Sequence, residues 1–247
     1  MTDRQGLSII LPALNEAQAL APLVQEIEGY CRERRIPAEI IIVNDGSTDG
    51  TAAVADRLAA ENPGVAVIHH GRNLGYGKAI RNGFRAARNP YLFYTDADRQ
   101  FAIRDLDHFW PHVRSGEADV VAGFRIDRQD SRLRRLLSWG FNRLVRMLFG
   151  LECRDVDCAY KLLSREAWRR MEITSDDALI DTEMFVKARM HRLRIKQVGV
   201  RHFPRQHGTS TVTLVCIIAV LRRLASFRRE LQVCKNTETA SKPVQAL

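Results

Sequence analysis

The chain has 247 residues, a length that suits one large domain or two small ones. Its hydrophobic content of 45% is enough for a sizeable core, which excludes a disordered chain or a disulfide-stapled miniprotein. The net charge of +9 favours an anionic partner, such as nucleotide phosphates, a membrane surface or nucleic acid, without choosing among them.

The first half of the chain alternates between short apolar strands and amphipathic helical patterns. Strands are expected at 7–11, 39–43, 65–69 and from Tyr91 onward. Pro12 is expected to close the first strand, and Asn15 to cap the helix after it. Four strands that alternate with four helices, with nearly continuous apolar runs, predict a parallel sheet covered on both faces.

The second half is less regular. We expect a strand at 119–123, a long helix at 131–149, a strand at 159–163, a helix through 183–190 and a strand at 195–200. No sharp boundary divides these elements. We therefore expect one domain over residues 1–211, an amphipathic helix over 212–235 and a disordered tail over 236–247.

Cysteines and apolar runs indicate where the protein works. The five cysteines form no C-x-x-C pair and are odd in number, which is typical of reduced, mostly buried thiols in a cytosolic protein. No signal-peptide pattern precedes the first strand, and the longest apolar run, Leu214 to Leu221, is too short to span a bilayer. We expect a cytoplasmic protein without transmembrane helices.

Two aspartates, Asp96 and Asp98, directly follow the strand that starts at Tyr91. Ligands of open α/β sheets bind beyond the carboxyl ends of the strands, where two hard oxygen ligands can hold a divalent metal against a diphosphate. The alternative is an ordinary strand-ending turn. Of the other two Asp-x-Asp pairs, at 105–107 and 155–157, the first lies in an amphipathic stretch and is expected on a solvated helix face.

The glycine-rich run from Gly71 to Lys78 matches neither common phosphate-binding fingerprint. Arg72 stands where a Walker A loop needs glycine, and Ala79 where it needs Ser or Thr. Ile80 occupies the third glycine position of a dinucleotide fingerprint. The run can still offer backbone amides, Arg72 and Lys78 to an anion. A plain strand-to-helix turn is the other interpretation.

Several motifs in order resemble the family 2 glycosyltransferases with the GT-A fold, most of all the dolichol- or polyprenyl-phosphate hexose synthases. The motifs are Ile10-Leu-Pro-Ala-Leu-Asn-Glu16, Ile42-Val-Asn-Asp-Gly-Ser-Thr-Asp49, Gly71-Arg-Asn-Leu-Gly-Tyr-Gly-Lys78, Thr95-Asp-Ala-Asp-Arg-Gln100, Val121-Ala-Gly-Phe-Arg125, Asp157-Cys-Ala-Tyr-Lys-Leu-Leu-Ser-Arg-Glu166, Ile180-Asp-Thr-Glu183 and Arg205-Gln-His-Gly-Thr-Ser210. The resemblance implies a Rossmann-like, mostly parallel sheet flanked by helices, with an irregular second half on the acceptor side. It also implies inverting transfer of a hexose from a nucleotide sugar of the GDP-mannose or UDP-glucose type to polyprenyl or dolichyl phosphate.

The resemblance also assigns site residues on the donor side. Asp98 and Gln100, with help from Asp96, would hold Mg²⁺ or Mn²⁺, and Asp45 would accept hydrogen bonds from the nucleotide base. The residues expected to line the pocket for nucleotide or phosphate are Pro12, Leu14, Asn15, Glu16, Arg72, Lys78 and Arg205. Three positions depart from the family pattern, namely Arg99 inside the metal motif, Phe101 and Phe124.

The nature of the acceptor decides whether a general base is needed. A lipid phosphate is anionic at neutral pH and needs none, whereas a hydroxyl needs a positioned carboxylate, for which Asp181 and Glu183 are the candidates. A phosphate would be clamped by arginines, and the candidates are Arg125, Arg134, Arg135 and Arg205. Arg134 and Arg135 equally suit a solvated basic face. Asp157 is either a pocket residue or an ion-pair partner of one of these arginines.

Two amphipathic segments, 131–149 and 212–231, bear on membrane contact. Each carries an apolar face and several arginines, so each can pack on the domain or lie at a membrane surface, and the second can also mediate dimerisation. We expect peripheral contact with the cytoplasmic face of the membrane. A non-catalytic nucleotide-binding protein, with its metal site spoiled by Arg99, is the rival from another class. Nucleic-acid binding is disfavoured because the arginines have no recognition fold around them.

Overall fold

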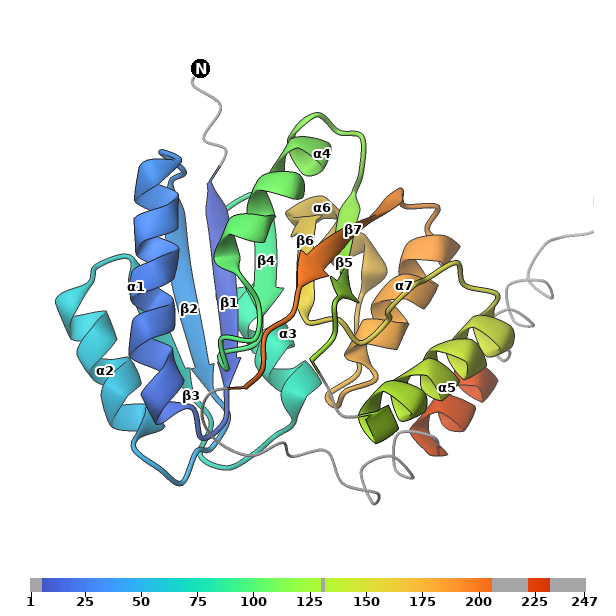
Figure 1. Cartoon of the computed structure of the whole chain (residues 1–247), viewed down its shortest axis with the longest axis horizontal. Helices are drawn as coiled ribbons and strands as arrows, with labels where there is room; N and C mark the ends of the chain where they lie inside the picture. Colours follow the sequence, from blue (N-terminus) through green and yellow to red (C-terminus); the bar gives the residue numbers. More distant parts are fainter. Residues whose placement is uncertain (1–5, 130–131, 206–221, 232–247) are drawn as a thin grey trace, which may run out of the picture.

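The computed structural model describes residues 6–129, 132–205 and 222–231. Its central sheet has the strand order β3-β2-β1-β4-β6-β5-β7 (Figure 1). The strands are β1 (Leu7–Ala13), β2 (Ala38–Asn44), β3 (Val65–His69), β4 (Tyr91–Thr95), β5 (Val120–Ile126), β6 (Tyr160–Ser164) and β7 (Ile195–Arg201). The helices are α1 (Ala17–Glu33), α2 (Thr51–Glu61), α3 (Tyr76–Ala86), the 3-10 helix η1 (Ile103–His108), α4 (Trp110–Arg114), α5 (Arg132–Phe149), α6 (Arg165–Met171) and α7 (Ile180–Met190), followed by helical residues 222–231.

The first four strands form the parallel half that their apolar runs predict. β1 pairs with β2 and β4, and β2 pairs with β3, all in parallel. Every residue of β1 is buried, because α1 covers one face of the sheet and α3 the other (Figure 1). This arrangement confirms the prediction of a mostly parallel sheet flanked by helices.

β6 is the exception to the parallel order. It lies between β4 and β5 and is antiparallel to both, while β5 and β7 pair in parallel. Because β6 is antiparallel, its first residue lies beside the carboxyl end of β4, with Tyr160 opposite Thr95. The segment before β6 therefore reaches the same sheet edge as Asp96 and Asp98.

Local predictions at the end of β1 were wrong in two respects. Pro12 lies inside the strand rather than ending it, and β1 continues to Ala13 beside β2. Pairing with β4 ends at Ile10, so the missing N–H of Pro12 costs no hydrogen bond on that side. Asn15 does not cap α1, whose N-cap is Glu16 and has no side-chain cap bond.

The region between β4 and β5 also differs from the prediction. Asp105, expected on a solvated helix face, is 4% exposed in η1 and accepts hydrogen bonds from the backbone and guanidinium of Arg201. Asp107 pairs with Tyr30 of α1 and with Arg34, the residue directly after that helix. Both aspartates therefore attach η1 to neighbouring elements, because the short 3-10 helix turns its polar residues inward.

A second apolar cluster lies at the β5 and β7 end of the sheet. Leu224 and Phe227 of residues 222–231 are buried in it, and Val145 of α5 joins them. Phe149 and Phe227 pack with ring centroids 5.8 Å apart, and Figure 1 shows the two helices side by side. The described part of the predicted 212–231 segment therefore packs on the domain, whereas residues 212–221 lie outside the described residues.

Within the described ranges, no helix combines the length and the apolar character needed to cross a bilayer. Cys31, Cys153 and Cys158 are buried free thiols, as expected, and the other two cysteines lie outside the described residues.

Candidate active site

Carboxylates from two neighbouring strands surround one guanidinium at the carboxyl edge of the sheet. Asp96 and Asp98 follow β4, and Glu16 follows β1. Arg205, from the segment after β7, places Nη2 at 2.6 Å from Glu16 Oε1 and 3.2 Å from Asp98 Oδ2. Glu16 is 7% exposed and Asp98 is 6% exposed. The structure thus brings together residues predicted separately as metal ligands and as nucleotide or phosphate contacts.

Asp96 is held by a tyrosine that the sequence analysis did not single out. The Tyr76 hydroxyl, at the start of α3, donates to Asp96 Oδ1 at 2.9 Å. Burial raises the pKa of Asp96 to about 7, and the charge of Asp98 adds to this rise. Burial likewise raises the pKa of Glu16 to about 7, where Arg205 opposes the rise and Asp98 increases it. The carboxylates are therefore crowded, and a further cation would relieve their repulsion.

Gln100 joins the aspartate turn to the segment after β7. Its backbone N–H donates to Asp98 Oδ1 at 3.0 Å, and its side-chain amide donates to the carbonyl of Phe203 at 3.0 Å. The backbone N–H of Phe203 donates back to the Gln100 carbonyl at 2.8 Å. The amide nitrogen of Gln100 is thus in use, and a ligand role for its oxygen stays a prediction.

The donor set fits a divalent ion whose coordination a bound phosphate completes. No three His, Cys, Asp or Glu side chains converge as a ready-made metal cage anywhere in the described ranges. Mg²⁺ is usually bound through one or two carboxylates together with substrate phosphates. Asp96 and Asp98 match that pattern, and burial, followed by the charge of Asp98, raises the pKa of Asp96.

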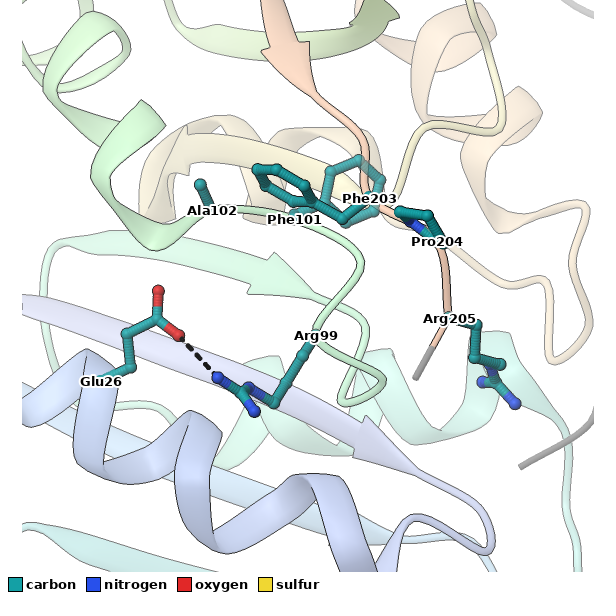
Figure 2. A pocket seen from close by; sticks show the side chains of 7 residues that line it. All are labelled: Glu26, Arg99, Phe101, Ala102, Phe203, Pro204 and Arg205. Atoms are coloured by element: carbon teal, nitrogen blue, oxygen red, sulfur yellow. Dashed lines mark ion pairs between the residues drawn. The ribbon is translucent and has the colours of Figure 1, made fainter. Parts of the chain in front are cut away.

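Arg99, which departs from the family pattern, points away from the two aspartates. It has a φ of 60° and reaches Glu26 of α1, with 3.8 Å between Nη2 and Oε2. Figure 2 shows this pair on one side of a cavity of about 430 Å³, with Phe203 and Pro204 on the other. The left-handed backbone turns the Arg99 side chain toward α1. The Arg99 guanidinium therefore has its partner on α1, and metal binding by the two aspartates stays a prediction.

Asp45 supports the glycine-rich run instead of standing open. Its carboxylate accepts hydrogen bonds from the backbone N–H groups of Leu74 and Gly75, at 2.8 and 3.0 Å, and contacts His70 Nδ1 at 2.7 Å. Asp45 is 4% exposed. Its predicted contact with a nucleotide base is untested, and these bonds show a structural role at the same sheet edge.

Close packing explains two glycines of the 71–78 run, Gly75 and Gly77. Gly75 has a φ of +105°, and a Cβ on Gly77 would lie 2.5 Å from the carbonyl oxygen of Asp177. Lys78 donates its backbone N–H to the Asp176 carbonyl at 3.0 Å, and its Nζ lies 3.7 Å from Asp176 Oδ1. Arg72 is exposed. These contacts account for the turn, while anion binding by Arg72 and Lys78 stays a prediction.

The remaining residues of the predicted nucleotide pocket lie in the last part of β1 or directly after it. Pro12 is buried and Leu14 is half-buried, whereas Asn15 is exposed with a φ of 58°. The Asn15 backbone N–H donates to Ser47 Oγ at 2.9 Å, and its side-chain oxygen accepts from the Thr48 N–H at 2.8 Å. Asn15 thus fixes two adjacent sheet-edge loops to each other.

Asp181 is neutralised by a fully buried lysine of β6. Lys161 Nζ lies 2.5 Å from Asp181 Oδ1 and donates to the carbonyls of Cys158 and Val156 at 2.7 and 3.1 Å. The Tyr94 hydroxyl also donates to Asp181. A lysine inside an otherwise apolar strand was the available sequence signal for this network, because a buried charge needs a partner.

Glu183 is bound on all sides and is poorly suited to act as a general base. It is fully buried, accepts from the backbone N–H groups of Thr174 and Ser175, and pairs with Lys187 Nζ at 2.8 Å. These hydrogen bonds outweigh the effect of burial and lower the pKa of Glu183. α7 begins three residues before the predicted helix, and this places Glu183 in its first turn.

Arg125 pairs with a carboxylate, Asp155, that could not be identified from the sequence. Its Nε and Nη2 donate to the two oxygens of Asp155 at 2.6 and 2.7 Å, and both side chains are below 10% exposed. Asp155, not Asp157, is therefore the ion-pair partner of Arg125. Arg134 and Arg135 are exposed on the first turns of α5. Clamping of a phosphate by these arginines stays a prediction.

The substitution Asp157→Asn is expected to stabilise the fold by on the order of 1–2 kcal/mol at pH 8, and by less at pH 5. Burial, together with the charges of Asp181 and Asp155, raises the pKa of Asp157 from 3.8 to about 7. The folded state therefore retains a proton that the unfolded chain loses above about pH 4, so wild-type stability falls as the pH rises toward 7. Urea unfolding at both pH values measures the difference.

The matched control for Asp157→Asn is Asp56→Asn on the exposed side of α2, where the side chain is 66% exposed. Equal stabilisation by Asp157→Asn at both pH values, or destabilisation at pH 8, would contradict the assigned charge crowding. A loss of activity together with a gain of stability is the expected sign of a carboxylate kept for function.

The substitution Tyr76→Phe is expected to weaken Mn²⁺ binding, in the presence of a nucleoside diphosphate, by about tenfold. The substitution keeps the ring but removes the hydroxyl that orients Asp96. Titration calorimetry measures the affinity. Tyr91→Phe, at the far end of β4, is the matched control, and an unchanged affinity in Tyr76→Phe would show that Asp96 needs no such support.

Known proteins are similar to the chain both in sequence and in fold. The model of the family "Glycosyl transferase family 2" matches residues 8–171. Glycosyltransferase AglD of Haloferax volcanii is 36% identical over 218 residues, which cover 85% of this chain and 34% of that protein. The undecaprenyl-phosphate 4-deoxy-4-formamido-L-arabinose transferase of Pseudomonas fluorescens is 32% identical over 221 residues, which cover 88% of this chain and 63% of that protein.

Solved structures agree on the fold. Glucosyl-3-phosphoglycerate synthase from Mycobacterium tuberculosis, in complex with Mn²⁺, UDP-glucose and phosphoglyceric acid, superposes with a TM-score of 0.65 at 18% identity. The match covers 83% of this chain and 73% of that one. The chain spans less than two thirds of the length of either sequence relative. The match to the family model covers well over half of this chain. This chain belongs to family 2 of the glycosyl transferases.

Proposed function

We propose that the protein transfers a hexose from a nucleoside-diphosphate sugar to polyprenyl phosphate, with inversion at the anomeric carbon. The observation that carries this proposal is the cluster of Glu16, Asp96, Asp98 and Arg205 at the sheet edge. The name of the undecaprenyl-phosphate relative supports the choice of acceptor.

Residues that directly follow β1 and β4 would bind the donor. Asp96 and Asp98, with Gln100 as a further ligand, would hold Mg²⁺ or Mn²⁺, which offsets the negative charge that develops on the departing diphosphate. Glu16, after β1, is linked to this position by Arg205, which also contacts Asp98. A donor of the GDP-mannose or UDP-glucose type is consistent with the Mn²⁺ and UDP-glucose that the structural relative binds.

An anionic acceptor suits the geometry better than a hydroxyl. A phosphate oxygen can attack the anomeric carbon directly, forming the sugar–oxygen bond as the bond to the diphosphate breaks, with no proton to remove. The two candidate bases are otherwise engaged, because Lys161 pairs with Asp181 and backbone amides surround Glu183. A hydroxyl acceptor would need one of them to leave these partners.

α5 offers a surface for a lipid membrane. Leu133, Leu136 and Trp139 are 67%, 62% and 59% exposed, next to exposed arginines. The other half of α5 is attached to the acceptor side, because Asn142 accepts the Val156 N–H at 2.8 Å. We infer peripheral binding to anionic lipid. Vesicle flotation tests this: Leu136→Glu should lose binding, whereas Met190→Glu, at the exposed end of the otherwise buried α7, should keep it.

A panel of labelled donors with synthetic polyprenyl phosphate tests the proposed reaction. Label that moves into the organic phase only with the lipid phosphate supports the proposal. Transfer to the corresponding polyprenol would favour the hydroxyl-acceptor alternative. Binding of a nucleoside diphosphate without transfer from any donor would favour a non-catalytic binding protein.

A further inference from the structure

Arg205 is shared by two buried carboxylates that come from different strands. Its Nη2 contacts Glu16 Oε1 at 2.6 Å and Asp98 Oδ2 at 3.2 Å, and its Nε lies 3.4 Å from the same Asp98 oxygen. The Arg205 side chain is 25% exposed, whereas both carboxylates are almost wholly buried. A charge-assisted contact at this degree of burial is much less screened by solvent than a surface ion pair.

The backbone before Arg205 is attached to the aspartate turn itself. Gln100 and Phe203 exchange two hydrogen bonds, one from the Phe203 N–H at 2.8 Å and one from the Gln100 side chain at 3.0 Å. Phe101 and His202 form an adjacent antiparallel bridge. Arg205 is therefore delivered to Asp98 by a segment that the same turn holds in place.

The contacts of Arg205 conflict with the binding of a metal at Asp98. A divalent cation there would have to share the Asp98 carboxylate with a positive guanidinium, and the two like charges repel each other. Glu16 alone can keep Arg205 nearby, since the shorter of the contacts is to Glu16. A diphosphate arriving with the metal offers oxygens that a guanidinium fits well.

We infer that Arg205 is a resident counterion of Asp98 and Glu16, which the metal displaces and which then pairs with the diphosphate of the donor. The inference rests on the proposed function, because it takes Asp98 as a metal ligand. It assigns Arg205 a positioning role in donor binding, and it makes the occupancy of the metal site depend on a residue of the acceptor-side half of the chain.

Titrations of Mn²⁺ with the full chain, followed by the electron paramagnetic resonance of the free ion, test the inference. Arg205→Gln is expected to bind Mn²⁺ alone about five- to tenfold more tightly than wild type, because the competing charge is gone. At saturating Mn²⁺, the same variant is expected to bind UDP or GDP about tenfold more weakly. A purely structural role of Arg205 would weaken both affinities, so opposite changes are diagnostic.

Two further variants complete the test. Arg205→Lys keeps the positive charge and is expected to bind Mn²⁺ alone as weakly as wild type. Arg201→Gln removes another arginine that pairs with a buried aspartate, Asp105, and should leave both affinities unchanged. The inference is overturned if Arg205→Gln binds Mn²⁺ alone no more tightly than wild type. If wild type binds neither nucleoside diphosphate in the presence of Mn²⁺, the proposed function itself is overturned.

Discussion

The substitution Asp98→Asn is expected to lower the rate of sugar transfer by about two to three orders of magnitude. The side chain keeps its shape but loses the charge that would bind the metal and that now holds Arg205. Radiolabel transfer from nucleotide sugar to polyprenyl phosphate measures the rate. Stability should change by less than about 1 kcal/mol, because the lost ion pair is offset by relief of the repulsion from Asp96.

The sequence itself provides the matched control for Asp98→Asn. Asp107 is the second aspartate of another Asp-x-Asp pair, and it binds Tyr30 of α1 and Arg34 directly after that helix. Asp107→Asn is expected to leave the rate within a factor of two. A rate within threefold of wild type for Asp98→Asn would rule out this carboxylate as a metal ligand.

The substitution Lys161→Met is expected to destabilise the protein by about 3–5 kcal/mol. This is a large share of the free energy of unfolding of a folded domain, which is usually about 5–15 kcal/mol. Lys161 is 0% exposed, and its removal leaves Asp181 as an uncompensated charge at 3% exposure. The carbonyls of Val156 and Cys158 also lose their shared donor. Urea unfolding at pH 7.5 measures the loss.

Two comparisons identify the cause of that loss. Adding Asp181→Asn to Lys161→Met should recover at least about 1 kcal/mol, because the unpaired charge is removed. Lys196→Met breaks an exposed pair with Glu117, in which the side chains are 46% and 49% exposed, and should cost less than about 1 kcal/mol. A cost for Lys161→Met no larger than that for Lys196→Met would show that the buried pair contributes little.

The repeating pattern of the chain already predicted much of the donor side. Apolar runs of strand length located the first four strands, and their alternation with helices predicted the parallel sheet. The same rule placed Asp96 and Asp98 at the carboxyl edge of the sheet, since they directly follow β4. These features depend on neighbours in sequence, which a single sequence displays directly.

Side-chain partners on the acceptor side were decided by tertiary structure alone. Arg205 and Asp98 are 107 positions apart, and Arg125 pairs with Asp155 because the segment before β6 reaches the end of β5. The insertion of β6 against the direction of its neighbours also places Lys161 beside Asp181. No local periodicity encodes which distant charge a buried side chain meets, because that choice follows from the packing of the whole sheet. The sequence alone thus determined the first four strands and the sheet edge that carries the aspartates, and the packing determined which charges meet at that edge.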